Sequence, residues 1–192
     1  MSIPPVLIVE PEPVVSAEEA KAQSYALAEL SDAQVNVLIA AATGQLDGPF
    51  GVMMRCIGEQ EWRQPFDQAE TTYRLPAFGN VAVTGVFIGS EEVDEAEYAA
   101  KQDALGVYVE GPASVTHIEF TAGFDVVPAN IKMAIILVAA DIHAKVSEQG
   151  NLRSFETYQA FTEQYSNPEV MSAATARVVQ ALLGRYRGLS YA

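Results

Sequence analysis

The sequence predicts an α+β fold, mainly an α-helical bundle with a small antiparallel β-sheet inserted into it. Apolar residues recur at helical spacing in two stretches, at about residues 17–47 and again at about residues 128–184. Between them, at about residues 50–122, glycines and prolines separate short runs rich in β-branched and aromatic residues. The order helix, strand, helix therefore places the sheet as an insertion between two groups of helices.

Composition limits the classes of function. Of the 192 residues, 49% are hydrophobic and 19% are charged, which is typical of a globular protein. The net charge of -14 argues against a protein that wraps nucleic-acid phosphates, because such binding needs clustered cations. Cys56 is the single cysteine, so neither an internal disulfide nor a cysteine-based zinc site is possible. We expect no cofactor and no metal.

The chain is expected to divide into an arm, one domain and a tail. Four prolines within the first 13 residues favour an extended arm at residues 1–15, where no secretory signal pattern is found. We therefore expect synthesis inside the cell. A single domain should follow at residues 16–184, and residues 185–192 should form a flexible basic tail, since no acidic residue follows Glu169.

Helix starts can be located from capping residues. Ser16 and Glu19 have the spacing of a capping box, which predicts a helix at about residues 17–29. Ser31 repeats the start signal, and the apolar residues after it predict a second helix that ends near residues 44–48. The break between them predicts a pair of packed helices.

The middle region shows the pattern of a small sheet. Strands are expected at residues 61–66, 71–75, 81–88, 105–110 and 115–121. In the last of these, Ile118 and Phe120 alternate with polar residues, which indicates one buried face. Five acids at residues 91–97 are interpreted as a solvated hairpin tip. They lack the residue order of a calcium-binding loop.

The most apolar helix candidate begins near Pro128, which suits a helix start because proline has no amide hydrogen to donate. Ile131, Ile135, Val138 and Ile142 form one stripe, and further apolar residues cover other faces. We therefore expect this helix to be buried on more than one side. A membrane span is the alternative, but the uninterrupted apolar run is too short for one.

Two helices are expected after this one. Residues 155–165 predict a short aromatic helix, and a last helix should start at residues 167–168. It should end near Leu183, with Gly184 as its C-terminal stop.

Few residues suggest chemistry. His117 and His143 are the only histidines, and both are interpreted as structural, as is Cys56 despite the neighbouring Arg55 that could lower its pKa. Trp62 is interpreted as a core anchor of the sheet, with a partner contact as the alternative. Glycine-rich phosphate-binding motifs and the nucleophile motif of hydrolases are absent from the sequence. We therefore predict that the protein is not an enzyme.

A succession of short motifs resembles the head-to-tail connector, or adaptor, proteins of long-tailed bacteriophages and gene transfer agents. The motifs are residues 15–21, 31–32, 38–43, Trp62, 74–76, 118–123, 127–128, 131–132, 134–135 and 182–187. Each motif is weak alone, and their joint order, over about residues 15–187, carries the resemblance.

The resemblance implies a structural virion protein of the neck, made in the bacterial cytoplasm. Its copies would form a homo-oligomeric ring, expected to be a dodecamer, that joins the portal protein of the capsid to a stopper or tail-completion protein. DNA would pass through the channel without sequence-specific binding, and an acidic lining would repel its phosphates. No membrane partner is expected. The residues expected to contact the portal are Arg185, Tyr186, Arg187, Leu189 and Tyr191.

Two alternatives come from other classes of protein. One is a non-viral protein-binding module that uses the sheet and the acidic loop to hold a partner. The other is a small hydrolase whose unrecognised site would use His117, Glu119 or His143.

Overall fold

The computed structural model describes residues 3–48, 51–152 and 171–186. The chain forms two compact units, which are described separately. The first, called the β unit, lies within residues 1–12 and 47–126. The second, called the helical unit, lies within residues 13–46 and 127–187.

The predicted fold class is wrong in its balance of helix and strand. The protein is 37% helix and 26% strand, with eight strands in two antiparallel sheets in the part that the structure describes, so it is not mainly a helical bundle. The five predicted strands correspond to β2, β3, β4, β7 and β8. The other three were missed because they do not alternate between apolar and polar residues: β1 is wholly apolar, and β5 and β6 are exposed and largely polar.

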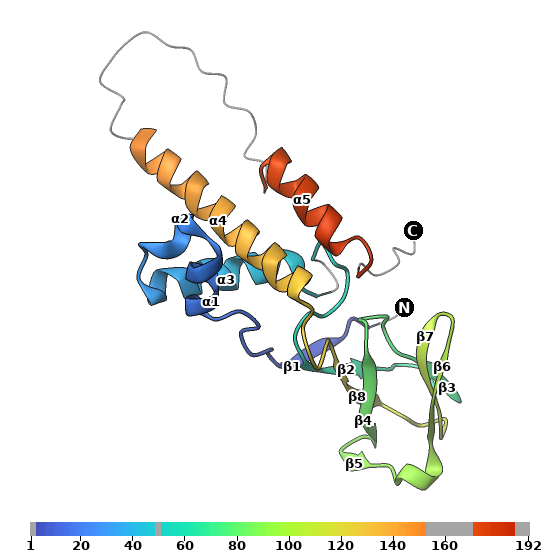
Figure 1. Ribbon diagram of the computed structural model, residues 1–192. Helices are drawn as coiled ribbons and strands as arrows, with labels where there is room; N and C mark the ends of the chain where they lie inside the picture. Colours follow the sequence, from blue (N-terminus) through green and yellow to red (C-terminus); the bar gives the residue numbers. More distant parts are fainter. Residues whose placement is uncertain (1–2, 49–50, 153–170, 187–192) are drawn as a thin grey trace. The chain divides into compact units, whose positions relative to one another are not determined.

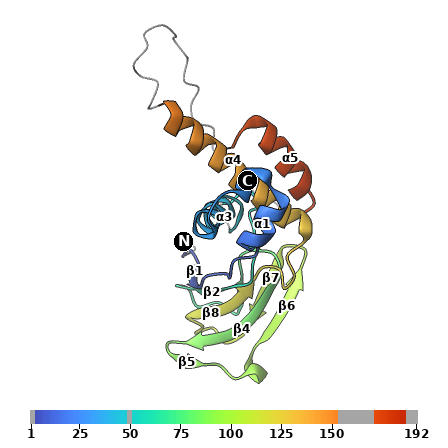
Figure 2. The ribbon, with the colours of Figure 1, turned by 60° about the vertical axis from the view of Figure 1, so that its left-hand side comes forward.

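The β unit contains one sheet of five strands and one of three, which lie face to face (Figures 1 and 2). The five-stranded sheet has the order β1 (Val6–Val9), β2 (Gln60–Pro65), β8 (His117–Ala122), β4 (Val81–Ile88) and β5 (Glu91–Glu92). The three-stranded sheet has the order β3 (Thr72–Arg74), β7 (Gly106–Glu110) and β6 (Ala99–Asp103). A short 3₁₀ helix, η1 (Glu95–Glu97), precedes β6.

The two sheets enclose a core of their own. It contains Cys56, Trp62, Tyr73, Leu75, Phe78, Val86, Val93, Val109, Val115, Ile118, Phe120 and Ala122. Trp62 packs edge-on against Phe78, with the ring centroids 5.0 Å apart, and lies opposite Phe120 on the neighbouring strand. Trp62 is therefore the core anchor that the sequence predicted.

A close backbone contact follows β8. Gly123 has φ +128°, and a Cβ atom added to it would lie 2.1 Å from the carbonyl oxygen of Gly58. Only glycine fits this position, because both the backbone conformation and the space exclude a side chain. The contact fixes the end of β8 against the segment that leads into β2.

The helical unit contains α1 (Ala17–Gln23), α2 (Tyr25–Ala28), α3 (Asp32–Leu46), α4 (Ala129–Leu152) and α5 (Ala173–Leu183). Ser16 caps α1 as predicted, because its hydroxyl oxygen accepts a hydrogen bond from the amide of Glu19 at 3.0 Å. The helix predicted at residues 17–29 is divided by Ser24, whose backbone is extended. The amide of Ser24 still donates to the carbonyl of Ala20, which closes α1.

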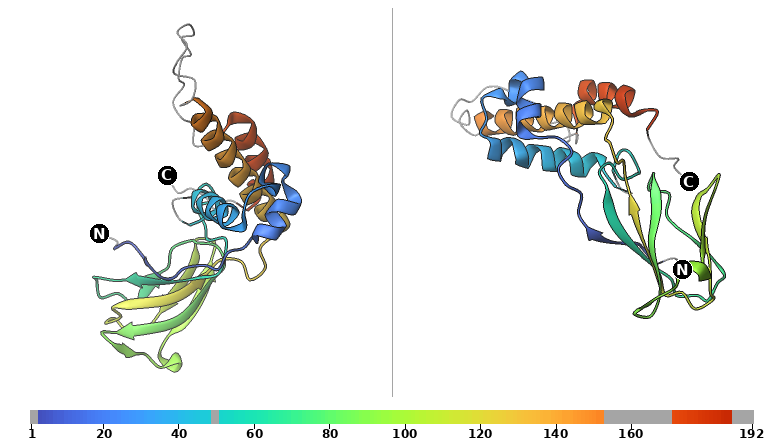
Figure 3. Two further views of the ribbon diagram at one scale, coloured as in Figure 1. Left: turned by 90° about the vertical axis from the view of Figure 1, so that its left-hand side faces the viewer. Right: turned by 60° about the horizontal axis from the view of Figure 1, so that its bottom comes forward.

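Helix α4 is the centre of the helical unit. It packs along α3 and α5 and also contacts α1 and α2, and Figure 3 shows this arrangement. Ile131, Ile135 and Val138 are fully buried, and Ile136 and Ala139, on other faces, are buried as well. The expectation of burial on more than one side is confirmed. Among the helices that the structure describes, none is long and apolar enough to cross a membrane.

The helix predicted at residues 155–165 lies outside the described residues, as does the predicted start of the last helix at residues 167–168. Helix α5 itself begins after Ser172, which is its N-cap, and Gly184 is its C-cap as predicted.

Candidate functional site

The two residues of the hydrolase alternative that lie in the β unit share one face of β8. His117 and Glu119 both point away from the core, because the residues that alternate with them, Ile118 and Phe120, are buried. Glu119 accepts hydrogen bonds from the guanidinium of Arg63 on β2, at 2.7 and 3.1 Å. His117 stacks on Phe87 of β4, with the ring centroids 4.6 Å apart.

The contacts of His117 hold its ring against the face of the sheet. Partial burial, and then the positive charge of Arg63, lower the pKa of His117, whereas Glu119 opposes this shift. Its Nδ1 lies 3.2 Å from the hydroxyl of Thr116, and which atom donates depends on the histidine tautomer. Because Phe87 covers the ring and Arg63 binds Glu119, these groups stabilise the face of the sheet. His143 lies on α4 in the helical unit.

Cys56 is enclosed in the core of the β unit. It has no exposed surface, and its burial and the negative charge of Asp47 raise the pKa of the thiol to about 12. Arg55 has the lowering effect that the sequence suggested, but it is the smallest of the influences on this group. The thiolate is the reactive form of cysteine, so this thiol is poorly suited to nucleophilic attack near neutral pH.

The acidic run is exposed, as expected of a solvated hairpin tip. Glu91 and Glu92 form β5, which turns back from β4, and the carboxylate of Asp94 caps η1 by accepting the amide of Ala96 at 2.9 Å. Within the described ranges, no group of three or more histidine, cysteine or acidic side chains is placed to hold a metal ion.

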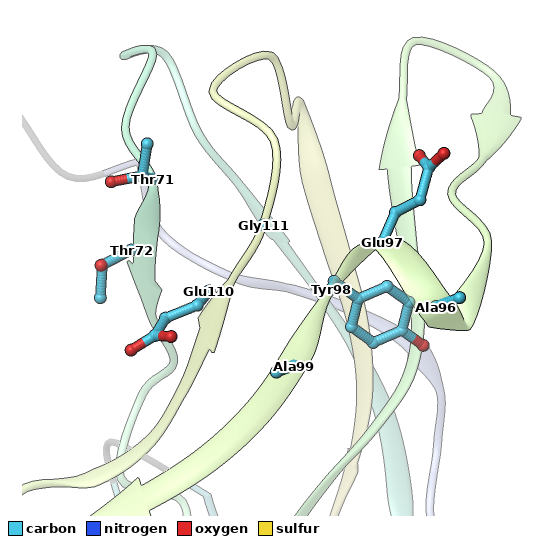
Figure 4. Close-up of a pocket in the computed structure, with 8 residues that line it drawn as sticks. All are labelled: Thr71, Thr72, Ala96, Glu97, Tyr98, Ala99, Glu110 and Gly111. Atoms are coloured by element: carbon cyan, nitrogen blue, oxygen red, sulfur yellow. The ribbon is translucent and has the colours of Figure 1, made fainter.

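A polar pocket of about 480 Å³ lies where η1 leads into β6 (Figure 4). The side chains that line it include Thr71, Thr72, Glu97, Tyr98 and Glu110. It is wide open to solvent, and Lys101 already forms an ion pair with Glu110. Such an open pocket is a poor site for a small molecule, which usually needs to be largely enclosed.

The residues expected to contact the portal fall at the end of the helical unit. Arg185 is exposed and lies over the ring of Tyr186, with 4.7 Å between the guanidinium carbon and the ring centroid. The amide of Tyr186 donates to the carbonyl of Leu183, so the chain continues directly from α5. Arg187, Leu189 and Tyr191 lie outside the described residues.

Strand β1 is a surface that the sequence reasoning missed. The predicted arm at residues 1–15 contains this strand, which pairs with β2 and with no other strand in the described part of the chain. All four of its side chains are exposed although all are apolar. The signal was present, because Val6, Leu7, Ile8 and Val9 form an uninterrupted β-branched and leucine run, but the prolines around it dominated the interpretation.

Comparison with known proteins leaves this picture unchanged: neither the protein-family models nor the curated proteins searched match this chain. The candidate sites are therefore judged on their geometry. An exposed apolar strand edge and a basic helix end are features that bind other chains, and they fit an interaction surface better than a catalytic centre.

Proposed function

We propose that this protein is a structural virion protein, whose copies form a ring that joins the capsid portal to the stopper or tail. It belongs in the neck of the particle, and DNA passes through the ring without sequence-specific binding. The ring is expected to contain twelve copies. The proposal starts from the ordered motifs that resemble those of connector proteins. The structure adds the contacts that these motifs make.

The observation that carries the proposal is that five of these motifs contact one another in pairs. Glu19 of the first motif forms an ion pair with Lys132 of the long helix at 3.3 Å, and Lys21 pairs with Asp32 at the start of α3. Trp62 of β2 lies directly opposite Phe120 of β8. The paired motifs are distant in sequence and in contact within their unit, which supports a scaffold role for them. A scaffold is what an assembly protein needs.

Charge distribution also supports the proposal. The whole chain carries a net charge of -14, yet after Glu169 it has three arginines and no acid. In the described part of this segment, Arg177 and Arg185 are exposed at the surface of the helical unit. A basic segment on an acidic protein is suited to dock on a complementary partner, whereas the acidic remainder would not bind DNA phosphates tightly.

Native mass spectrometry and electron microscopy of the purified protein, alone and mixed with portal, test the ring. We expect closed rings of about twelve copies each, at least in the presence of portal, because identical head-to-tail contacts close into rings. A chain that stays monomeric in both samples and binds no portal would contradict the proposal.

Deletion of residues 184–192 tests the portal contact. The deletion removes two of the three basic residues of the C-terminal segment and the C-cap of α5 but none of its helical residues, so it should abolish co-purification with portal and lower the melting temperature only slightly. A matched variant with Arg74→Ala removes one positive charge from an exposed ion pair of the β unit, outside this segment, and should retain portal binding. Unchanged binding after the deletion would show that the portal contact lies elsewhere on the protein.

A further inference from the structure

The edge of β1 is apolar to an unusual degree for a strand that faces solvent. Val6, Leu7, Ile8 and Val9 retain 55%, 37%, 43% and 48% of their surface exposed. Exposed strand edges are normally protected by charged residues, because their unpaired backbone groups bind other strands. None of the four residues of β1 is charged. Intramolecular packing therefore does not explain this sequence.

The strand is nevertheless held firmly in place. It pairs with β2, and the side-chain amide of Gln64, itself only 4% exposed, donates to the carbonyl of Ile3 at 2.7 Å. The start of the strand is thus fixed to the β unit by a buried group. A fixed strand whose outer edge is open presents a preformed template for a further strand.

The other outermost strands of the β unit carry charged residues. Strand β5 has only two residues, and both are glutamates. Strand β6 carries Lys101 and Asp103, and β3 has three residues that include Arg74. Among the outermost strands of the two sheets that the structure describes, β1 alone lacks a charged residue, so the outermost strand that matches it in chemistry is another copy of β1.

The pairing of β1 with β2 shows which residues of β1 share a face. Val6 lies opposite Arg63 and Val9 lies opposite Glu61, because the register shifts between Leu7 and Val9. Arg63 and Glu61 are two residues apart on β2, so they point to the same side of the sheet, and so do Val6 and Val9. Without the register shift, residues three apart would point to opposite sides.

We propose that β1 pairs antiparallel with β1 of a second copy of this chain, with Val6 of one copy opposite Val9 of the other. Residues directly opposite in an antiparallel pair must point to the same face, and the register shift meets this condition. The run of Val, Leu, Ile and Val is apolar throughout and is similar when read in either direction, so the two copies present matching residues to each other. The two five-stranded sheets become one continuous sheet across a two-fold axis.

Charge favours this register over pairing with β5. Glu10 of one copy falls opposite Pro5 of the other, and Glu12 falls opposite Ile3, so no acid faces an acid. Pairing with β5 would bring Glu10 towards Glu91 and Glu92, and like charges on paired strands destabilise the pair. This inference goes beyond the proposed function and does not depend on it.

Cysteine cross-linking between two differently labelled variants tests the pairing and its register. Opposite Cβ atoms lie about 5 Å apart, close to disulfide distance, whereas the same residue in two copies would be offset by three positions, or about 10 Å. An equal mixture of Val6→Cys and Val9→Cys should therefore form a disulfide-linked dimer under mild oxidation. Each variant alone should not, and Cys56 is buried and should not interfere.

The pattern of cross-links separates the alternatives. Parallel pairing in register would link each variant to itself, and pairing with β5 or β6 would link neither variant in the mixture. Either pattern would overturn the proposal. Because valine and cysteine differ little in size and both are compatible with strands, these variants should fold, and matching melting temperatures would verify this.

The Ile8→Lys variant tests whether the contact holds copies together in solution. A lysine on β1 should weaken association by at least about tenfold, because a charge must be removed from water or the pairing given up. In native mass spectra at equal concentration the particle mass should fall to half that of the original protein. Val126→Lys changes an 85% exposed apolar residue outside the strands and should leave the mass unchanged. Equal masses for Ile8→Lys and the original protein would contradict the proposal.

Discussion

The start of α5 is attached to α4 by one carboxylate, Asp141. Its Oδ2 accepts the backbone amide of Ser172 at 3.0 Å, and its Oδ1 accepts the hydroxyl of Thr175 at 2.9 Å. Lys145, one turn further along α4, lies 3.4 Å from the same carboxylate. The side chain of Asp141 is only 10% exposed. Asp141→Ala should therefore release the start of α5 from α4.

The size of the effect follows from the two hydrogen bonds. Each has a charged acceptor and contributes about 1.5–3 kcal/mol, but they share one carboxylate and are not additive. We expect Asp141→Ala to lower the free energy of unfolding by about 2–4 kcal/mol, and Asp141→Asn by about half as much, since one oxygen acceptor remains. Against a total stability of about 5–15 kcal/mol, this loss is easily measured by urea denaturation.

Hydrogen exchange locates the effect. The amides of α5 should lose protection in Asp141→Ala, while those of β2 and β8 in the β unit should change little. Asp32→Ala, which removes an acid from an exposed ion pair of the helical unit, should cost no more than about 1 kcal/mol and serves as the control. Unchanged stability together with unchanged exchange in α5 would refute the role assigned to Asp141.

The pH dependence has a definite sign. Burial works against the charged form of Asp141, but the hydrogen bonds from Ser172 and Thr175 and the charge of Lys145 outweigh it and lower the pKa of Asp141. A carboxyl whose pKa is lowered on folding stabilises the protein above its unfolded pKa of about 3.9 and loses this contribution as the pH falls through the lower folded value. The difference in stability between the original protein and Asp141→Ala should therefore shrink below about pH 4.

Three further substitutions test the packing of the two units. Gly123→Ala should destabilise the protein by at least about 3 kcal/mol, because the new Cβ would collide with a backbone oxygen, whereas Gly44→Ala in open space on α3 should stabilise it by about 0.5–1 kcal/mol. Val138→Asp should unfold the helical unit, because it buries a carboxylate. Val146→Asp, at a 62% exposed position on the same helix, should fold normally. Equal melting temperatures for the two variants would show that the buried face of α4 is assigned wrongly. Cys56 should react with a thiol reagent at pH 8 only as fast as the protein unfolds. Because its pKa is raised to about 12, the thiol contributes to stability fully below about pH 9, and this contribution should decline as the pH rises towards 12. The rate of reaction with the reagent should increase accordingly.

Local signals in the sequence were sufficient where one segment decides its own structure. The capping residues Ser16 and Glu19 located α1, and the spacing of Ile131, Ile135 and Val138 identified the buried faces of α4. The alternation around Ile118 and Phe120 identified β8 as a strand with one buried face. These patterns depend only on which residues of a segment face water and on hydrogen bonds within that segment, so they can be interpreted without knowing the rest of the fold.

The sequence patterns did not predict structure where a residue or strand is held by a partner that is distant in the chain. Strand β6 is exposed along its whole length and is held by pairing with β7, so its sequence carries no alternation. Asp141 looked like an interruption of an apolar helix, because its partner Ser172 is 31 residues away. For the same reason the sequence did not indicate that residues in the predicted arm would pair with β2 as β1.

The two proposed assemblies make demands that can be separated by experiment. Pairing through β1 is isologous, so it joins copies only in twos and cannot by itself close a ring of more than two. A connector ring needs a second, head-to-tail contact, which Ile8→Lys should not touch. If both proposals hold, this substitution halves the particle mass and leaves single rings that still bind portal. If Ile8→Lys forms rings of unchanged mass, the β1 contact alone is contradicted. If the cysteine variants form cross-linked dimers but the protein never forms rings or binds portal, the connector function alone is contradicted.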